Sequence, residues 1–394
     1  MTNYTRMEGK EHITEITSFS RCLVLEGKKC NLLSKTGLKY VAVVELEEGE
    51  DTITRKMVSG FQGVTKVIIP KGIKRICKGA FKKFEDLKYV DIPTSVVTVE
   101  EEAFMGCFAL EKIDLVEVQV VDKKAFYECP NLTSVKMEKV SYIGKDAFSR
   151  CMNLDNVCLP AILTLDEGGF SNCFELKSLI LGAFLKKIEC SAFANCLKLV
   201  NVDLPESLEK IGACAFLNCR ELKEITIPSK VKRIMPSTFW CCDSLERVVV
   251  KGNISKIGKS AFLMNFNLKE INLPDSITKI DFEAFWDCRS LEKITLPKHL
   301  KYINVCAFSG CTSIKEVIFN DELKMIGRRA FYGCENLTSV NINEGVLSIR
   351  KEAFANCNAL ENITIPSTVN KIGILVFGTI NESKILNKSS KKIS

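Results

Sequence analysis

A phenylalanine returns at an almost constant spacing along most of this chain of 394 residues. Its copies are 23 residues apart, except for three consecutive steps of 22 between Phe104 and Phe170. The fourteen copies are Phe81, Phe104, Phe126, Phe148, Phe170, Phe193, Phe216, Phe239, Phe262, Phe285, Phe308, Phe331, Phe354 and Phe377. Self-similarity at such a period is the signature of a repeat architecture, in which each unit is one small supersecondary element. We therefore expect a stack of similar units rather than two or three globular domains.

The rest of the unit keeps step with the phenylalanine, as residues 215–228 show. Cys219 follows the phenylalanine by three residues, Ile225 and Ile227 follow it by nine and eleven, and Pro228 comes next. The alternation at the end predicts a short strand with one buried face, and proline ends it because proline cannot donate to a continuing ladder. The Ala-Phe-x-x-Cys-x-x-Leu part has a three-residue rhythm, which predicts a short helical or 3₁₀ turn.

One such unit cannot bury its own apolar edge, whereas stacked units bury each other's. The sequence therefore predicts an α/β repeat solenoid of about 14 coils. With parallel strands about 4.8 Å apart, the body would be roughly 65–70 Å long. The phenylalanines would form a buried spine, in which each ring contributes roughly 1.5–3 kcal/mol of transfer free energy.

The pattern Ala-Phe-x-x-Cys-x-x-Leu-x-x-Ile-x-Ile-Pro resembles the BspA-like (treponemal-type) class of leucine-rich repeats. The resemblance covers about residues 58 to 377. It implies a right-handed solenoid with a parallel sheet on one face, usually the concave one, and short helical or irregular segments on the other. It also implies a protein-binding or adhesive role, since many members of that family lie on cell surfaces.

The two ends depart from the repeat. Residues 1–57 match it weakly and carry an acidic run between Glu45 and Asp51. We expect an N-terminal cap there, because terminal repeats shield an exposed core end; a separate small functional module is the alternative. The solenoid would span residues 58–380, and residues 381–394, rich in Lys, Ser and Asn, have the composition of a flexible polar tail.

The chain has 19 cysteines, and eleven of them occupy the same repeat position. A buried cysteine behaves as a small hydrophobic residue, so we expect a column of buried thiols. A disulfide ladder is the alternative, because neighbouring coils lie within bridging distance. The odd total favours free thiols in a reducing compartment. No metal or cofactor is expected, since His12 and His299 lack a nearby cysteine pair.

The compartment is inferred from what the N-terminal residues lack. Met1 to Lys10 are polar, and no apolar leader segment follows them. No window approaches the roughly 18 continuous apolar residues that a membrane span needs. We therefore expect a cytoplasmic protein, with the cell surface reached by an unconventional route as the alternative.

Strand residues eight and ten after each phenylalanine should point outward and form the default binding surface. In three successive coils, residues at these positions and the one before them make a patch nearly free of charge, which Asp155, Lys177 and Asp203 border. The residues are Asn156, Cys158, Ser178, Ile180, Val200 and Asn201. Clustered apolar residues at solvent-facing positions mark interaction sites, so this patch is the main candidate for docking a partner. Ordinary exposed surface, or shielding by curvature, is the alternative.

Charged residues form two other kinds of row. From Lys223 to Glu316, positions seven and eight alternate in sign between coils, which predicts a ladder of self-neutralising pairs. Seventeen residues after the phenylalanine is a basic row: Lys187, Lys210, Arg233, Lys256 and Lys279. With a net charge of +7, this row suits acidic proteins or anionic lipid heads, or is simply a solvated edge. Nucleic-acid binding is not expected, because no aromatic residues interleave with the row.

Three classes of function remain. The repeat architecture favours a monomeric, non-enzymatic scaffold or adaptor that binds other proteins. A surface adhesin is the alternative that the resemblance suggests. An enzyme is not expected. The segment from Gly252 to Ser260 is one residue too long for a phosphate-binding loop, and Cys158 has no evident histidine partner.

Overall fold

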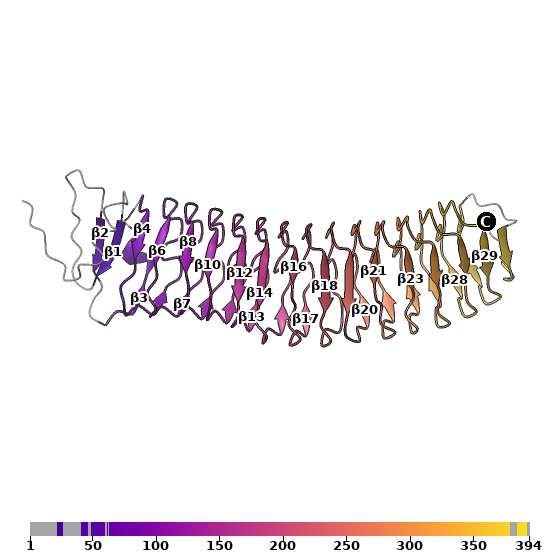
Figure 1. Cartoon of the computed structure of the whole chain (residues 1–394), viewed down its shortest axis with the longest axis horizontal. Helices are drawn as coiled ribbons and strands as arrows, with labels where there is room; N and C mark the ends of the chain where they lie inside the picture. Colours follow the sequence, from indigo (N-terminus) through magenta and orange to yellow (C-terminus); the bar gives the residue numbers. More distant parts are fainter. Residues whose placement is uncertain are drawn as a thin grey trace, which may run out of the picture.

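The computed structural model describes residues 22–26, 41–45, 49–59, 61, 63–378 and 384–391. It is a rod of stacked coils, in which each coil repeats the path of the one before (Figure 1). The expected solenoid is confirmed. Most of the expected N-terminal cap, including Met1 to Lys10, lies outside the described residues.

Each coil contributes one strand to a main parallel row along the rod, and the register places every residue beside the one 22 or 23 positions later. Cys158, for example, pairs with Ile180. Within β12, Val157 and Leu159 are buried, while Asn156 and Cys158 are exposed, so the strand has the single buried face that its alternation predicts. The repeat strands of this row are β4 (Lys66–Ile68), β6 (Tyr89–Asp91), β8 (Lys112–Asp114), β10 (Ser134–Lys136), β12 (Asn156–Leu159), β14 (Ser178–Leu181), β16 (Asn201–Val202), β18 (Glu224–Ile227), β19 (Arg247–Val250), β21 (Glu270–Ile271), β23 (Lys293–Thr295), β25 (Glu316–Ile318), β27 (Ser339–Asn341) and β29 (Asn362–Ile365).

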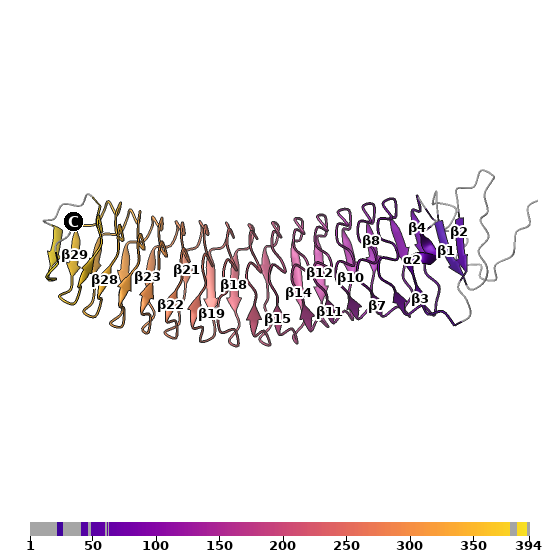
Figure 2. The ribbon, with the colours of Figure 1, turned by 180° about the vertical axis from the view of Figure 1, so that it is seen from behind.

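A second parallel row forms where the sequence predicted only a turn. Its strands have two residues each, and the second residue, such as Ile188 in β15, is usually buried. Two residues are enough because the neighbouring coils hold the backbone in register on both sides. The row runs along the edge labelled β7, β11 and β15 in Figure 2. Its strands are β3 (Thr52–Ile53), β5 (Arg75–Ile76), β7 (Thr98–Val99), β9 (Val120–Val121), β11 (Tyr142–Ile143), β13 (Thr164–Leu165), β15 (Lys187–Ile188), β17 (Lys210–Ile211), β20 (Lys256–Ile257), β22 (Lys279–Ile280), β24 (Tyr302–Ile303), β26 (Met325–Ile326), β28 (Ser348–Ile349) and β30 (Lys371–Ile372).

The third side of each coil, which holds the Ala-Phe segment, is not helical, contrary to expectation. Its backbone N–H groups alternate between two kinds of acceptor. Phe216 N donates to Thr238 O of the next coil at 2.9 Å, whereas Cys219 N donates to Phe216 O at 3.3 Å. Residues with positive φ, such as Asn218 (59°), occur twice per coil. They prevent a continuous helix and direct every second N–H group along the rod.

The spine phenylalanines fill the centre of the rod. Rings of neighbouring coils stack with centroids 5.0 to 5.8 Å apart, and Phe216 is completely buried. The cysteine column lies beside them, and each thiol bonds to the coil before it: Cys219 Sγ donates to Phe193 O at 3.3 Å. Burial raises the pKa of Cys219 to about 12, so the thiol keeps the proton that it donates. The cysteines from Cys77 to Cys357 are free thiols.

The main row, which consists of sheets of nine, three and five strands, extends beyond the repeat at both ends. β1 (Cys22–Glu26) pairs with β4, and β2 (Val41–Glu45) pairs with β1. A short helix, α2 (Arg55–Val58), precedes the first regular coil. From it, the Arg55 guanidinium donates to Ala80 O and Lys82 O. At the equivalent positions of the next coil, the carbonyl groups of Ala103 and Met105 accept from backbone N–H groups.

At the other end, β31 (Ile385–Asn387) pairs with β29. Part of the segment expected to be a flexible tail, residues 381–394, is therefore a strand. The physical reason is that the last repeat strand offers an unpaired backbone edge, which three residues of almost any composition can satisfy.

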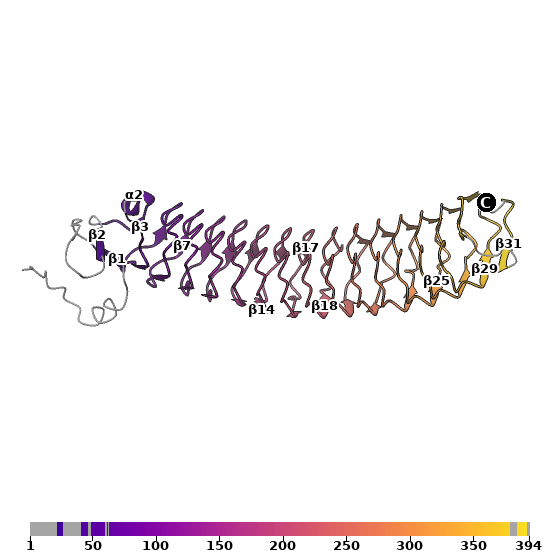
Figure 3. The same cartoon turned by 90° about the horizontal axis from the view of Figure 1, so that it is seen from above.

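The rod is only gently bowed. In Figure 3, the edge labelled β14, β18 and β25 lies on the outer side of the bow. The strand face is thus slightly convex along the rod, instead of the concave face that was expected. A solenoid curves when one of its sides rises further along the axis per repeat than the opposite side does. Here every side consists of strands or turns rather than wide helices, so the sides advance almost equally.

Candidate functional site

The central patch consists of the six uncharged residues Asn156, Cys158, Ser178, Ile180, Val200 and Asn201. Strands β12, β14 and β16 place five of them on the exposed face, where Asn156, Ser178 and Asn201 form one row. Ile180 is 56% exposed. Val200 precedes β16 and is only half-buried. The structure thus brings the predicted residues together on three adjacent strands.

Two large apolar side chains beside the central patch were missed from the sequence. Phe184, at the corner between β14 and β15, is 70% exposed, and Leu163, near the corresponding corner of the preceding coil, is 53% exposed. We call them the corner pair. A signal was available for Phe184, because the residues at its repeat position in other coils are small or polar. They are Ser95, Glu117, Lys139, Ala161, Ser207, Lys230, Asn253, Ser276, His299, Glu322, Gly345 and Thr368.

The corner before Phe184 is tight. Gly182 stands where many coils have proline, and a Cβ atom there would lie 2.2 Å from Pro160 O. The backbone of β14 can therefore turn close against the preceding coil. Ile180 and Phe184 are held on either side of this turn, so their side chains project from a rigid backbone.

The central patch has no catalytic constellation around it. Cys158 is exposed, but the described histidine, His299, lies six coils further along, where its Nδ1 is 2.9 Å from Glu322 Oε1. No group of three or more potential metal-ligating side chains occurs in the part of the chain that the structure describes. The chemistry that this surface offers is apolar contact and hydrogen bonding to amides and hydroxyls.

Beyond the central patch, the strand face carries the ladder of alternating charges. At position seven, Lys269 pairs with Glu246 at 2.8 Å and Lys315 pairs with Glu292 at 3.3 Å. Position eight adds the pairs Arg247–Glu270 (3.7 Å) and Lys293–Glu316 (3.2 Å). The hydrogen bond from Lys269 lowers the pKa of Glu246. This half of the face neutralises itself, as its alternation predicts.

The basic row differs from a continuous column of unpaired cations. Lys210 pairs with Glu189 at 2.5 Å, and Lys256 and Lys279 both contact the nearly buried Asp281, at 2.7 and 3.5 Å. Lys187 and Arg233 are exposed and form no ion pair within the described residues. Two acidic residues that were not considered in the sequence, Glu189 and Asp281, thus pair with three of the five cations and offset part of their charge.

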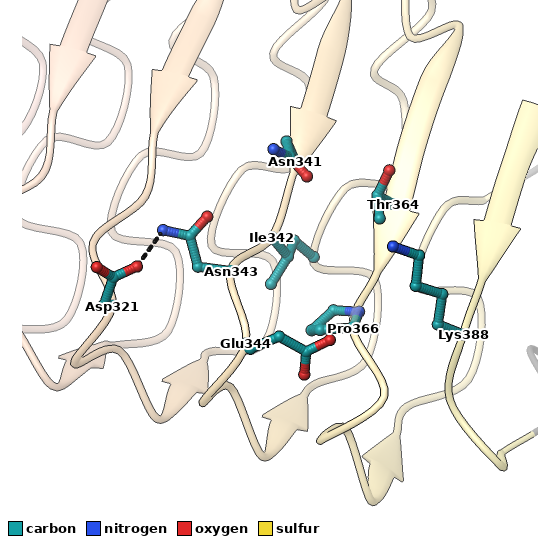
Figure 4. A pocket seen from close by; sticks show the side chains of 8 residues that line it. All are labelled: Asp321, Asn341, Ile342, Asn343, Glu344, Thr364, Pro366 and Lys388. Carbon is teal, nitrogen blue, oxygen red and sulfur yellow. Dashed lines mark hydrogen bonds between the residues drawn. The ribbon is translucent and has the colours of Figure 1, made fainter.

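A shallow hollow of about 500 Å³ opens near the C-terminal end of the main sheet. Its polar groups are largely engaged within the protein (Figure 4). Asn343 Nδ2 donates to Asp321 Oδ1 at 2.8 Å, and Glu344 accepts hydrogen bonds from Ser367 and Thr368. Lys388 extends its ammonium group over the hollow. The carboxylates are thus committed to holding the coils together.

No helix in the described residues has the length to cross a bilayer, since α2 has four residues.

The fold and the repeat are similar to those of known proteins. A crystal structure of a leucine-rich repeat protein from Bacteroides ovatus aligns over 100% of this chain and 97% of that one, with 28% identity and a TM-score of 0.65. A leucine-rich cell surface protein from Faecalibacterium prausnitzii aligns over 95% of this chain and 88% of its own, with 22% identity and a TM-score of 0.42. Among curated proteins, no sequence matches this chain.

A family model of the BspA-type leucine-rich repeat region, with six copies, matches residues 51–177, 163–292 and 278–394. Together these matches cover the chain from residue 51 onward, including every spine phenylalanine. The chain therefore belongs to the BspA-type leucine-rich repeat family.

Proposed function

We propose that this chain is a non-enzymatic scaffold or adaptor that docks another protein on the central patch and the corner pair. The observation that carries the proposal is the exposure of Ile180 and Phe184, at 56% and 70%, within one coil. Large apolar side chains gathered on an otherwise polar surface mark interaction sites. The family supports the same class of function, since its members are commonly interaction or surface proteins.

The free energy gained by burying these side chains is large enough for a docking site. Complete burial of an apolar side chain of this size contributes roughly 1.5–3 kcal/mol, and a few such anchors supply most of the binding energy in a typical interface. Because Ile180 belongs to β14, which is paired on both sides, little backbone ordering is needed when a partner binds. Pre-organisation of this kind reduces the entropy that binding costs.

The test is affinity capture from whole-cell lysate with the full chain, read by mass spectrometry. We expect Ile180→Glu and Phe184→Glu to lose the same proteins. Ile318→Glu is the matched control, because Ile318 has the same repeat position as Ile180 and is also exposed, at 41%. Loss of the same proteins with all three variants, or retention with all three while circular dichroism shows native folding, would count against the central patch.

A surface adhesin is the second candidate, favoured by the family to which the chain belongs. It places the same patch outside the cell, where a host or neighbouring-cell protein would bind. A membrane-impermeant biotin reagent applied to intact cells distinguishes the two. Labelling of the chain favours the adhesin, whereas labelling only after lysis favours the intracellular scaffold.

A further inference from the structure

The two tryptophans of the chain occupy the same repeat position, directly after the spine phenylalanine. They are Trp240 and Trp286. Leu217 has this position in the coil before Trp240, and Leu263 has it in the coil between the two tryptophans. We call these four residues the tryptophan stripe. Coil-to-coil hydrogen bonds hold it in line: Asn218 N donates to Trp240 O at 2.7 Å, and Met264 N donates to Trp286 O at 2.8 Å.

The surface around the tryptophan stripe is also apolar. Trp286 is 37% exposed, and beside it Phe282 and Met264 are 43% and 36% exposed; Pro236 is exposed as well. At the repeat position of Phe282, the coils from Cys190 to Pro236 and the coil of Val305 have uncharged residues, and Lys259 is the one cation among them. Charged residues return further out: Lys123, Lys145 and Glu167 on one side, Arg328 and Lys351 on the other. The mostly uncharged coils are thus bounded by charge at both ends and contain one cation.

The charge left unpaired around the stripe is mostly positive. Arg233, Lys259 and Arg328 are exposed and form no ion pair within the described residues. The neighbouring acids are mostly engaged: Asp243 with Arg220 at 3.8 Å, Asp281 with Lys256 at 2.7 Å and Asp287 with Arg289 at 3.6 Å. Glu283 accepts a hydrogen bond from Ser260 at 3.0 Å. Negative charge on a partner that covers the stripe would therefore complement these cations and speed its association.

The coil spacing indicates the shape of that partner. Between Phe216 and Phe285, successive rings are 5.6, 5.4 and 5.2 Å apart. An α-helix has a pitch of about 5.4 Å, so a helix lying along the rod would place one side chain per turn over each coil. Residues at i, i+4, i+7 and i+11 form such an apolar face.

We propose that the tryptophan stripe docks an acidic amphipathic helix of another protein, with its apolar face on the stripe and its carboxylates near Lys259 and Arg328. This surface lies on a different side of the coil from the central patch, and the proposal does not depend on that patch. A protein partner fits better than a lipid surface. Leu263 is only 7% exposed and Trp240 Nε1 is buried, so these side chains lie against the rod instead of projecting from it.

The test uses the full chain and a synthetic peptide of about 18 residues, long enough for a helix to cover the stripe. The peptide has Leu at the i, i+4, i+7 positions and mainly Glu elsewhere. Because both tryptophans lie in the stripe, their emission reports on this surface alone. We expect the peptide to shift the emission to shorter wavelength and to protect it from iodide quenching.

Variants then locate the contact, with a labelled peptide and fluorescence anisotropy as the readout. Trp286→Gln, and separately Lys259→Glu combined with Arg328→Glu, should weaken binding about tenfold or more, as for the loss of an interface anchor. Tyr127→Gln is the matched control, since Tyr127 has the same repeat position four coils before Leu217, away from Lys259 and Arg328, and it should bind as the native chain does.

Four results would overturn the proposal. The first is no emission shift at millimolar peptide. The second is equal binding of a peptide with Lys in place of Glu, which refutes the charge argument. The third is equal binding of a peptide with the same composition and scrambled spacing, which refutes the helical register. The fourth is an emission shift with phosphatidylserine vesicles and none with peptide, which assigns the stripe to a lipid surface.

Discussion

Replacing Phe216 by alanine tests whether the phenylalanine spine is what holds the coils together. Phe216 is completely buried. Its ring stacks between those of Phe193 and Phe239, with both centroid distances 5.6 Å. Substitution of a buried phenylalanine by alanine costs about 3–5 kcal/mol, and the cost is greatest where the surroundings cannot close the cavity. Hydrogen-bonded coils on both sides limit that closure, so we expect a loss in the upper part of this range.

Two further variants separate the contributions. Phe216→Leu keeps most of the buried apolar volume and removes two ring pairs, so it should cost roughly 1–2 kcal/mol. Phe377→Ala should cost less than Phe216→Ala, because the last spine ring stacks on Phe354 alone. Coils at the end of a solenoid also open more readily than those in the middle.

The free energy of unfolding would be measured by urea denaturation, followed by circular dichroism for all variants in the same buffer. The expected order of destabilisation is Phe216→Ala, then Phe377→Ala or Phe216→Leu. A loss below about 1 kcal/mol for Phe216→Ala, with the cooperative transition retained, would refute the view that stacked rings carry the core.

Four other perturbations follow from particular contacts. Asn265→Cys should raise the free energy of unfolding by about 1–3 kcal/mol in urea, because Asn265 keeps the column's hydrogen bond to the preceding coil but leaves its Oδ1 buried and unpaired within the described residues. Cys158 should be alkylated before the cysteines of the column, since Cys158 is exposed and the column thiols are buried, which raises the pKa of Cys196, for example; mass spectrometry showing rapid labelling of the column would contradict this. Hydrogen bonds from Lys123 and Lys78 lower the pKa of Glu101 to about 2. Glu101→Gln should therefore lower the free energy of unfolding by at most about 1 kcal/mol above pH 4.5, and this difference should vanish as the pH falls toward 2. Ending the chain after residue 383 removes β31 and opens the edge of β29, and size-exclusion chromatography should then show association; an unchanged monomer would mean that β31 does not protect that edge.

The central patch was predicted from the sequence, whereas Phe184 and the tryptophan stripe were missed. The central patch was predicted because Ile180 and Cys158 break the polar pattern at outward strand positions. Phe184 breaks its own corner position just as clearly, but corners had been treated as turns without a facing surface. The tryptophan stripe was missed because only the strand face and the basic row had been considered as binding surfaces, although both tryptophans have the same repeat position.

Charge pairing was predictable only where the partners share a repeat position. Lys269 and Glu246 lie at the same position of adjacent coils, and their ion pair follows from the period alone. The pair between Lys256 and Asp281 joins different positions. Its existence depends on how closely the second row of strands approaches the following turn.

The sequence by itself determined the period, the stacking, the buried spine and the strand alternation, because each of these depends only on which residues recur at which spacing. The tertiary structure decided what depends on distances between coils. It placed a second strand row where a turn was expected, made the rod nearly straight, and added a strand from the residues after the last repeat. The physical reason is that backbone N–H and C=O groups form hydrogen bonds with the neighbouring coil, about 5 Å away, whichever side chains they carry. The sequence pattern describes only the side chains.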